Sequence, residues 1–146
     1  TSLLTSVVRS GTGARAAKVG GPVAGKTGTS NQNRDAWFVG YTPELVAAVW
    51  VGHDDYRPLG PGETGGRAAV PIWVSFVKQA LGKAGGRDFP VPPAVVFRHV
   101  DPQTGHAVAE GTPGAQRECF LPGTAPEPAT SPAVDPGDHV MQDDEE

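Results

Sequence analysis

The feature that most constrains the fold is a run of seven consecutive apolar residues, Leu45–Val51. It follows a segment rich in aromatic and β-branched residues, Ala36–Tyr41, and only the short turn Thr42-Pro43-Glu44 separates the two. This arrangement predicts two antiparallel strands joined by a turn. Together with the segment that ends at Thr29, before the polar loop Ser30–Arg34, they are predicted to form three successive antiparallel strands. Because the second run shows no polar alternation, we expect it to be buried on both faces, with cover on each side of the sheet.

Two stretches with helical spacing of apolar residues lie on either side of these strands. The first ends at Ser10-Gly11, and the second has Pro71 in its first turn and Gly82 at its end. The apolar positions are Leu3, Leu4, Val7 and Val8 in the first, and Ala69, Ile72, Trp73, Phe76, Val77 and Ala80 in the second. The fold class predicted is therefore α+β, an antiparallel sheet flanked by helices.

Charge and composition divide the chain into parts. Residues 126–146 hold seven of the 16 acidic residues and no lysine or arginine, and ten of the 15 prolines follow Phe89. We expect residues 1–84 to form the folded part, residues 85–125 a proline-rich, irregular extension with room for a small hairpin, and residues 126–146 a disordered acidic tail. The basic excess outside the tail is too weak and scattered to predict nucleic-acid binding.

Outside the phosphate-loop interpretation considered below, we expect no metal, and we expect no cofactor and no membrane span in this chain. Cys119 is the single cysteine, and His53-Asp54-Asp55 alternate in direction on an extended chain, so we expect a polar strand end there. There is no apolar run of 18 residues and no signal peptide, and the chain begins without methionine. We expect it to be part of a longer protein.

The densest chemistry lies in the stretch Val23–Ser30, which combines a lysine, three hydroxyl residues and two glycines. Such a segment is suited to binding an anion. On a strand, Thr27 and Thr29 would point to one face, and Lys26 and Gly28 to the other.

Two motif interpretations fit this stretch. Gly20–Thr27 satisfies the spacing of a phosphate-binding loop, and Asp54-Asp55 could then hold Mg²⁺. That loop requires a strand before it and a helix starting at the Lys-Thr, which the flanking sequence predicts poorly. The other interpretation is the Lys-Thr-Gly signature of serine-nucleophile penicillin-binding enzymes.

The second interpretation extends over about residues 1–82. The sequence resembles the C-terminal part of the transpeptidase domain of a class A, bifunctional penicillin-binding protein, and Phe120–Pro126 is similar to a C-terminal segment of that family. The matching segments, in order, are Gly11-Thr12-Gly13, Ala24–Thr29, Asp35–Pro43, Val49–Gly52, Thr64–Gly66 and Ala69–Trp73.

The resemblance implies a fold like that of β-lactamases and penicillin-binding transpeptidases, here as a partial domain. It also implies a peptidoglycan D,D-transpeptidase that cross-links D-Ala-D-Ala stem peptides through a serine acyl-enzyme and is trapped by β-lactams. The expected location is the cell envelope, on the periplasmic side of the inner membrane, with a membrane anchor and a glycosyltransferase domain elsewhere in the protein. We expect the nucleophilic serine in an upstream half of the domain, so that this chain alone is inactive. A phosphate-loop fragment and an inactive penicillin-binding-like module remain alternatives.

The resemblance also implies roles for four residues. Lys26 would shape the positive field around the serine and the substrate carboxylate, and Thr27 and Thr29 would offer hydroxyls to that carboxylate. Gly28 would let a neighbouring segment pack closely against the strand. The Thr29 N–H would complete an oxyanion hole, in which a single donor contributes roughly 2.7–4 kcal/mol. We expect Trp37, Trp50 and Trp73 to belong to the core.

Overall fold

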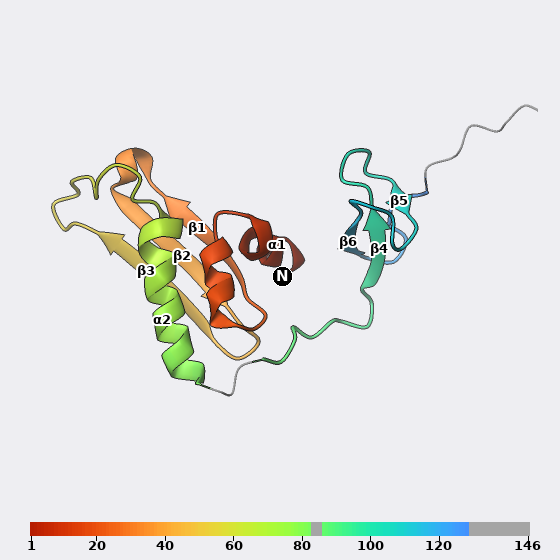
Figure 1. The fold of residues 1–146 in the computed structure, drawn as a ribbon, viewed down its shortest axis with the longest axis horizontal. Helices are drawn as coiled ribbons and strands as arrows, with labels where there is room; N and C mark the ends of the chain where they lie inside the picture. The colour runs from red at the N-terminus through yellow and green to blue at the C-terminus, as the bar shows by residue number, and fades with distance from the viewer. Residues whose placement is uncertain (83–85, 129–146) are drawn as a thin grey trace, which may run out of the picture. The chain divides into compact units, whose positions relative to one another are not determined.

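The computed structural model of the chain describes residues 1–82 and 86–128. They belong to two compact units, Thr1–Pro92 and a second unit that begins at Pro93 (Figure 1). The disordered tail predicted for residues 126–146 falls almost wholly outside the described residues. The domain boundaries predicted from composition stay predictions.

The first unit contains a three-stranded antiparallel sheet in the order β1-β2-β3. Its strands are β1 (Ala24–Thr29), β2 (Asp35–Tyr41) and β3 (Val46–Gly52), joined by short connections. The three successive strands expected from the sequence are thereby confirmed. Lys26 lies on β1, which is an end strand of this sheet.

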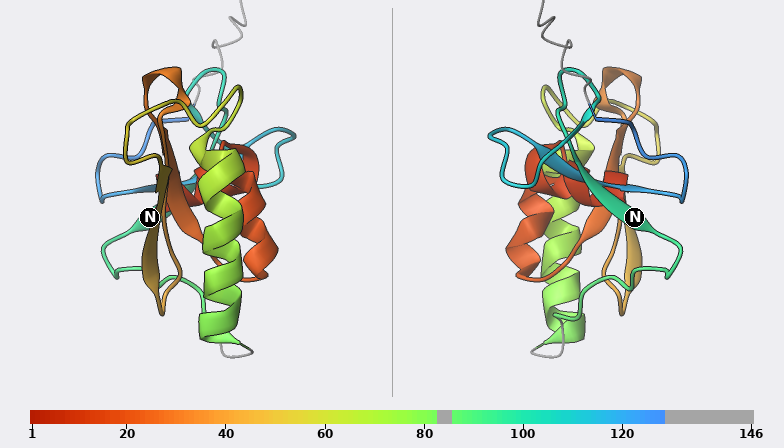
Figure 2. Two further views of the ribbon diagram at one scale, coloured as in Figure 1. Left: turned by 90° about the vertical axis from the view of Figure 1, so that its left-hand side faces the viewer. Right: turned by 90° about the vertical axis from the view of Figure 1, so that its right-hand side faces the viewer.

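Helical segments cover one face of the sheet (Figure 2). They are α1 (Ser2–Ser10), the 3₁₀ helix η1 (Ala14–Val19), the π-helical turn η3 (Gly65–Ala69) and α2 (Val70–Leu81). A further short 3₁₀ helix, η2 (Asn31–Asn33), belongs to the connection between β1 and β2. Both helices predicted from apolar spacing are confirmed, and Pro71 lies in the first turn of α2, where its missing N–H is tolerated.

The core lies between this helical layer and the covered face. Phe38 of β2 and Trp73 of α2 are fully buried and meet edge to face, with ring centroids 5.2 Å apart. The Trp73 indole N–H also donates a 3.0 Å hydrogen bond to the Ala47 carbonyl, so the polar atom of this buried side chain is satisfied. The core assignment of Trp73 is correct.

The opposite face of the sheet is exposed, and two predictions are wrong there. Along β3 more and less exposed residues alternate, with Val46 69% exposed, so this strand is not buried on both faces. Trp37 and Trp50 are 44% and 45% exposed and lie on this face rather than in the core. The reason is physical: an apolar sequence shows that a strand can be covered, and here the helices cover only one face.

The second unit contains a small antiparallel sheet in the order β5-β4-β6. Its strands are β4 (Val96–Val100), β5 (Ala107–Val108) and β6 (Gln116–Phe120). The hairpin allowed by the sequence is present, with its second strand starting at Ala107 because Gly105, at a φ of 75°, belongs to the turn. Strand β6 was not expected, since its Arg, Glu and Gln residues hide the alternation of a strand. The extension is therefore less irregular than its proline content suggests.

Candidate active site

The four predicted site residues lie together on β1. Register with β2 places Lys26 opposite Val39, and Gly28 opposite Trp37, on the exposed face of the sheet. Thr27 lies opposite the buried Phe38, on the face that the helical layer covers. The predicted alternation along the strand is thus present, and it divides the lysine from the two threonines.

The backbone of β1 turns every second residue's polar groups toward an edge with which no other strand of the described sheet pairs. The Ser30 N–H donates to the Asp35 carbonyl of the neighbouring strand, at 3.0 Å. Since successive N–H groups of an extended strand point in opposite directions, the Thr29 N–H points away from β2, toward the free edge. An N–H in this position is available to a ligand, as an oxyanion donor must be.

The ammonium group of Lys26 lies at the same edge. Its Nζ donates a 2.9 Å hydrogen bond to the Thr27 carbonyl, which by the same alternation points away from β2. Lys26 is exposed. A positive charge, an outward N–H and two hydroxyl side chains therefore lie within four consecutive residues of one strand edge.

Each of the two threonine hydroxyls has a hydrogen-bond partner from a distant segment. The Gly65 N–H donates to Thr29 Oγ1 at 3.1 Å, so the Thr29 proton is free to be donated elsewhere. Thr27 Oγ1 lies 2.6 Å from Thr12 Oγ1, and either atom can be the donor. The threonine side chains are thus held in place from outside the strand.

Close packing of the η3 turn against β1 depends on a glycine that the sequence analysis left without a role. A Cβ atom on Gly65 would lie 2.6 Å from the Gly28 carbonyl oxygen and would also collide with the Trp37 carbonyl. The expected close approach of a segment to the strand at Gly28 is present, but the missing side chain that permits it belongs to Gly65. At Gly28 itself, an added Cβ would meet the Trp37 Cβ at 3.2 Å.

Loop contacts hold the segment before η3 near the end of β1. The Leu59 N–H donates to the Asn33 carbonyl at 2.8 Å, and the Asn33 side-chain amide donates to the Gly60 carbonyl at 3.2 Å. Arg34 donates to the Tyr56 carbonyl and stacks over its ring, 4.9 Å from the centroid. These contacts place the Thr64–Gly66 segment where it can reach Thr29.

A surface groove of about 370 Å³ adjoins this edge. Arg15 and Arg67 bring two guanidinium groups to its wall, and Arg67 is partly neutralised by Glu63 at 3.4 Å. The other lining residues are Gly11, Thr12, Ala14, Thr64 and Gly66. The groove therefore offers a positive field beside the threonine hydroxyls.

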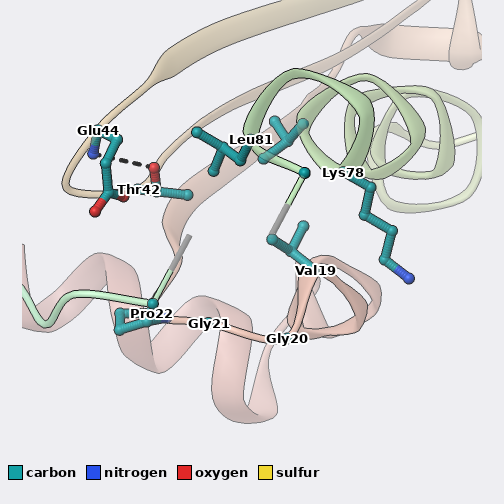
Figure 3. Close-up of a pocket in the computed structure, with 11 residues that line it drawn as sticks. Val19, Gly20, Gly21, Pro22, Thr42, Glu44, Lys78 and Leu81 are labelled. Atoms are coloured by element: carbon teal, nitrogen blue, oxygen red, sulfur yellow. Dashed lines mark hydrogen bonds between the residues drawn. The ribbon is translucent and has the colours of Figure 1, made fainter. Parts of the chain in front are cut away.

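A second, smaller cavity lies elsewhere in the first unit (Figure 3). Its volume is about 50 Å³, enough for water but not for a peptide. Thr42 Oγ1 accepts the Glu44 N–H there, while Glu44 Oε2 is buried without a partner among the described residues. The Lys78 side chain extends away from Glu44 (Figure 3). This cavity holds none of the predicted site residues.

The expectation of an upstream nucleophile rested on the absence of a Ser-x-x-Lys from this sequence. That premise is wrong, because Ser75–Lys78 has this spacing. Ser75 is exposed on α2, two residues from each of the buried Trp73 and Val77, and its hydroxyl accepts from Gln79 at 3.3 Å. It therefore points away from the sheet, whereas Lys26 belongs to the opposite sheet face. The two groups do not form one site.

The phosphate-loop alternative does not fit the structure. Lys26 and Thr27 lie in the middle of a strand rather than at the start of a helix, and the preceding segment is the 3₁₀ helix η1.

Within residues 1–82 and 86–128, no three His, Cys, Asp or Glu side chains gather as metal ligands would. No helix in the described part of the chain is long and apolar enough to cross a bilayer.

Comparison with known proteins identifies the fold. Residues 1–76 match the family of the penicillin binding protein transpeptidase domain. The chain is 45% identical over 121 residues to penicillin-binding protein 1A of Pseudomonas aeruginosa, covering 82% of this chain, and 38% identical over 127 residues to that of Aquifex aeolicus, covering 85%. The crystal structure of penicillin-binding protein 1A from Haemophilus influenzae superimposes with a TM-score of 0.73 at 34% identity, over 84% of this chain.

The chain spans 15% and 17% of the length of the two curated relatives, and 19% of the crystallised chain. The match covers the strand with Lys26, the η3 turn and most of α2. The family match, the two relatives and the crystal structure together confirm the predicted α+β fold and the predicted resemblance to class A penicillin-binding proteins. The chain belongs to the transpeptidase domain family of penicillin-binding proteins.

Proposed function

We propose that this chain supplies the Lys-Thr-Gly-Thr wall of a peptidoglycan D,D-transpeptidase. The observation that carries the proposal is the free edge of β1, where the Lys26 ammonium, two threonine hydroxyls and an outward N–H occur within four residues. Such a set of donors matches a substrate that has both a carboxylate and a carbonyl under attack.

In the proposed reaction a serine from another part of the domain attacks the carbonyl of the penultimate D-alanine. The Thr29 N–H stabilises the negative charge that develops on the carbonyl oxygen, and Lys26 adds a positive field at the serine. The hydroxyls of Thr27 and Thr29 bind the terminal carboxylate. D-Alanine leaves, and an amine of a second stem peptide takes the acyl group.

The exposed face of the sheet supports the interpretation that this chain is one part of a larger domain. Trp37, Trp50 and Val46 leave apolar surface on the face opposite the helical layer. Apolar surface on this scale is costly to leave in water. We propose that the remainder of the transpeptidase domain covers it and brings the nucleophile to the edge of β1.

We infer the location of the whole protein from its relatives. The relatives carry the name penicillin-binding protein 1A, and the resemblance to their family implies an enzyme of the cell envelope. From the resemblance to class A enzymes we infer that the whole protein is a bifunctional glycosyltransferase and transpeptidase, anchored in the inner membrane and working on its periplasmic side.

Labelled penicillin tests the proposal. The full-length protein that contains this chain should be acylated stoichiometrically, and peptide mass spectrometry should place the label on a serine outside residues 1–146. Ser75→Ala is the matched control, since Ser75 points away from β1, and it should be acylated at the unchanged rate.

Two outcomes would overturn the proposal. Absence of label on a folded protein would favour the inactive module, which keeps the scaffold without the nucleophile. Label on Ser75 would show that the reaction does not use the edge of β1.

A further inference from the structure

The motif Gly11-Thr12-Gly13 has no role in the reaction described above, although it reaches the candidate site. Thr12 Oγ1 lies 2.6 Å from Thr27 Oγ1. It is a side-chain contact between residues 15 apart in sequence, joining the loop after α1 to the strand with Lys26.

The fold holds Thr12 firmly in this position. The N–H groups of Gly11 and Gly13 both donate to the Val7 carbonyl at the end of α1, at 3.0 and 3.2 Å. An added Cβ at Gly11 would lie 2.8 Å from that carbonyl oxygen. On the other side, Gly66 packs so closely that its own Cβ would lie 2.5 Å from the Thr12 carbonyl. The two hydrogen bonds to Val7 and the close packing that Gly11 and Gly66 permit therefore hold the backbone at Thr12.

The two hydroxyls have only two arrangements. If Thr27 donates to Thr12, its proton is used and it cannot donate to a substrate carboxylate. If Thr12 donates to Thr27, the Thr27 proton is free for the carboxylate. The Thr12–Thr27 hydrogen bond then polarises the Thr27 hydroxyl and strengthens its hydrogen bond to the carboxylate. An anion beside Thr27 favours the second arrangement.

We propose that Thr12 is a positioning residue that turns the Thr27 hydroxyl toward the carboxylate of the stem peptide or β-lactam. The proposal rests on the proposed function of the Lys26 strand. Thr12 also lines the groove that bears Arg15 and Arg67, whose positive field attracts a carboxylate to the neighbourhood of this hydroxyl pair. Thr12 thus acts through Thr27 and not on the reacting carbonyl.

The test compares acylation rates of full-length variants by a labelled penicillin that keeps its free carboxylate. Thr12→Val preserves the shape and removes the donor, and it should lower the second-order acylation rate constant about tenfold, the effect of one hydrogen bond to a group that binds an anion. Thr12→Ser keeps the donor and should stay within about twofold of the wild type. Thr5→Val, which removes an α1 hydroxyl bonded to the Ser2 carbonyl, is the matched control and should leave the rate unchanged.

Two further measurements separate positioning from a structural role. In a double-mutant cycle, Thr12→Val should add little to the loss caused by Thr27→Val, because both remove the same hydrogen-bond chain. With the methyl ester of the same penicillin, whose carboxylate is masked, Thr12→Val and the wild type should react at nearly equal rates.

The outcomes distinguish this inference from the proposed function. If the wild type is not acylated at all, the proposed function and the role of Thr12 are both overturned. If it is acylated and Thr12→Val loses as much with the ester as with the free acid, or adds its full loss to that of Thr27→Val, only the role of Thr12 is overturned. A Thr12→Val enzyme at the wild-type rate would overturn it as well.

Discussion

The two units of the chain are stabilised in different ways. In the first unit Phe38, Val70, Trp73 and Val77 are fully buried, and they form a core between the sheet and its helices. In the second unit Val100 is the buried hydrophobic residue of the described strands, at 9% exposure. There a backbone ladder, turns and the stacking of Arg117 over Phe97, at 3.6 Å, take the place of a packed core.

This difference determines which unit can hold the side chains of a functional site in fixed positions. Thr27 and Thr29 are fixed by Thr12 and Gly65, whose own segments pack on the core of the first unit. Polar groups of the second unit are satisfied locally: Arg98 donates to the carbonyl of its own neighbour Phe97. A site needs its side chains held from several directions by rigid elements. In the described residues, the first unit has that property at β1.

The largest expected effect is on the acylation rate, where replacing Lys26 of the first unit is compared with replacing Arg98 of the second. In the full-length protein, Lys26→Ala should slow acylation by about 10² to 10⁴, because under the proposed function it removes the charge beside the reacting serine. Lys26→Arg should rescue only partly, since a planar guanidinium cannot replace a compact ammonium. Stopped-flow acylation measures both. Arg98→Ala in the second unit is the control and should leave the acylation rate unchanged. A decrease as large as that of Lys26→Ala would show that the site does not depend on the first unit alone.

Core truncation comes next in size. Trp73→Ala should destabilise the first unit by about 3–5 kcal/mol, through lost burial and a cavity, and it also removes the hydrogen bond to Ala47. Phe97→Ala in the second unit should cost less than half as much, because Phe97 is only partly buried. Hydrogen exchange at amides of β2 and β4 reports the two units separately. Equal losses would show that both have a packed core.

A smaller effect is expected at the stacked pair of the second unit. Arg117→Ala should destabilise β4 and β6 by about 0.5–1 kcal/mol, the usual contribution of an exposed cation–π contact. Arg117→Lys should retain part of it. Exchange rates of the β4 amides give the change. Protection unaltered by Arg117→Ala would mean that the ladder alone stabilises this sheet.

The smallest effect is one of pH, at the turn after β4. Hydrogen bonds from the Gln103 N–H and the Thr104 hydroxyl hold the pKa of Asp101 below its ordinary value of 3.8. A lowered folded pKa means that the turn is stabilised above pH 3.8 and loses this contribution as the pH falls through the folded value. An NMR titration of the Gln103 amide should show a midpoint below 3.8 that Asp101→Asn abolishes. A midpoint at or above 3.8 would contradict the assignment.

Much of the first unit could be predicted from local patterns. Apolar spacing predicted α1 and α2, and the turn at Thr42–Glu44 predicted the β2–β3 hairpin, because these signals depend on neighbours in sequence. Which face of a strand is covered depends on segments far away, so the exposure of Trp37 and Trp50 in the described residues, where a core position was expected, could not be predicted. The unexpected β6 shows the reverse, since its pairing with β4 stabilises a strand that its own composition does not favour.

The candidate site was predictable only in part. The motif Lys26–Thr29 and its alternation could be predicted because they lie within one strand. Thr12 and Gly65 could not be assigned roles, because their contacts with Thr27 and Thr29 span 15 and 36 residues. The available signal was their setting among glycines, which indicates close backbone approach without naming the partner.

The most direct test of the central claim is a crystal structure of the full-length protein acylated by a β-lactam that has a free carboxylate. The account predicts that this carboxylate accepts hydrogen bonds from Thr27 Oγ1 and Thr29 Oγ1, and that the acyl carbonyl oxygen accepts one from the Thr29 N–H, at ordinary distances of about 2.7–3.1 Å. An acyl-enzyme whose carboxylate and carbonyl oxygen both lie away from the edge of β1 would contradict it.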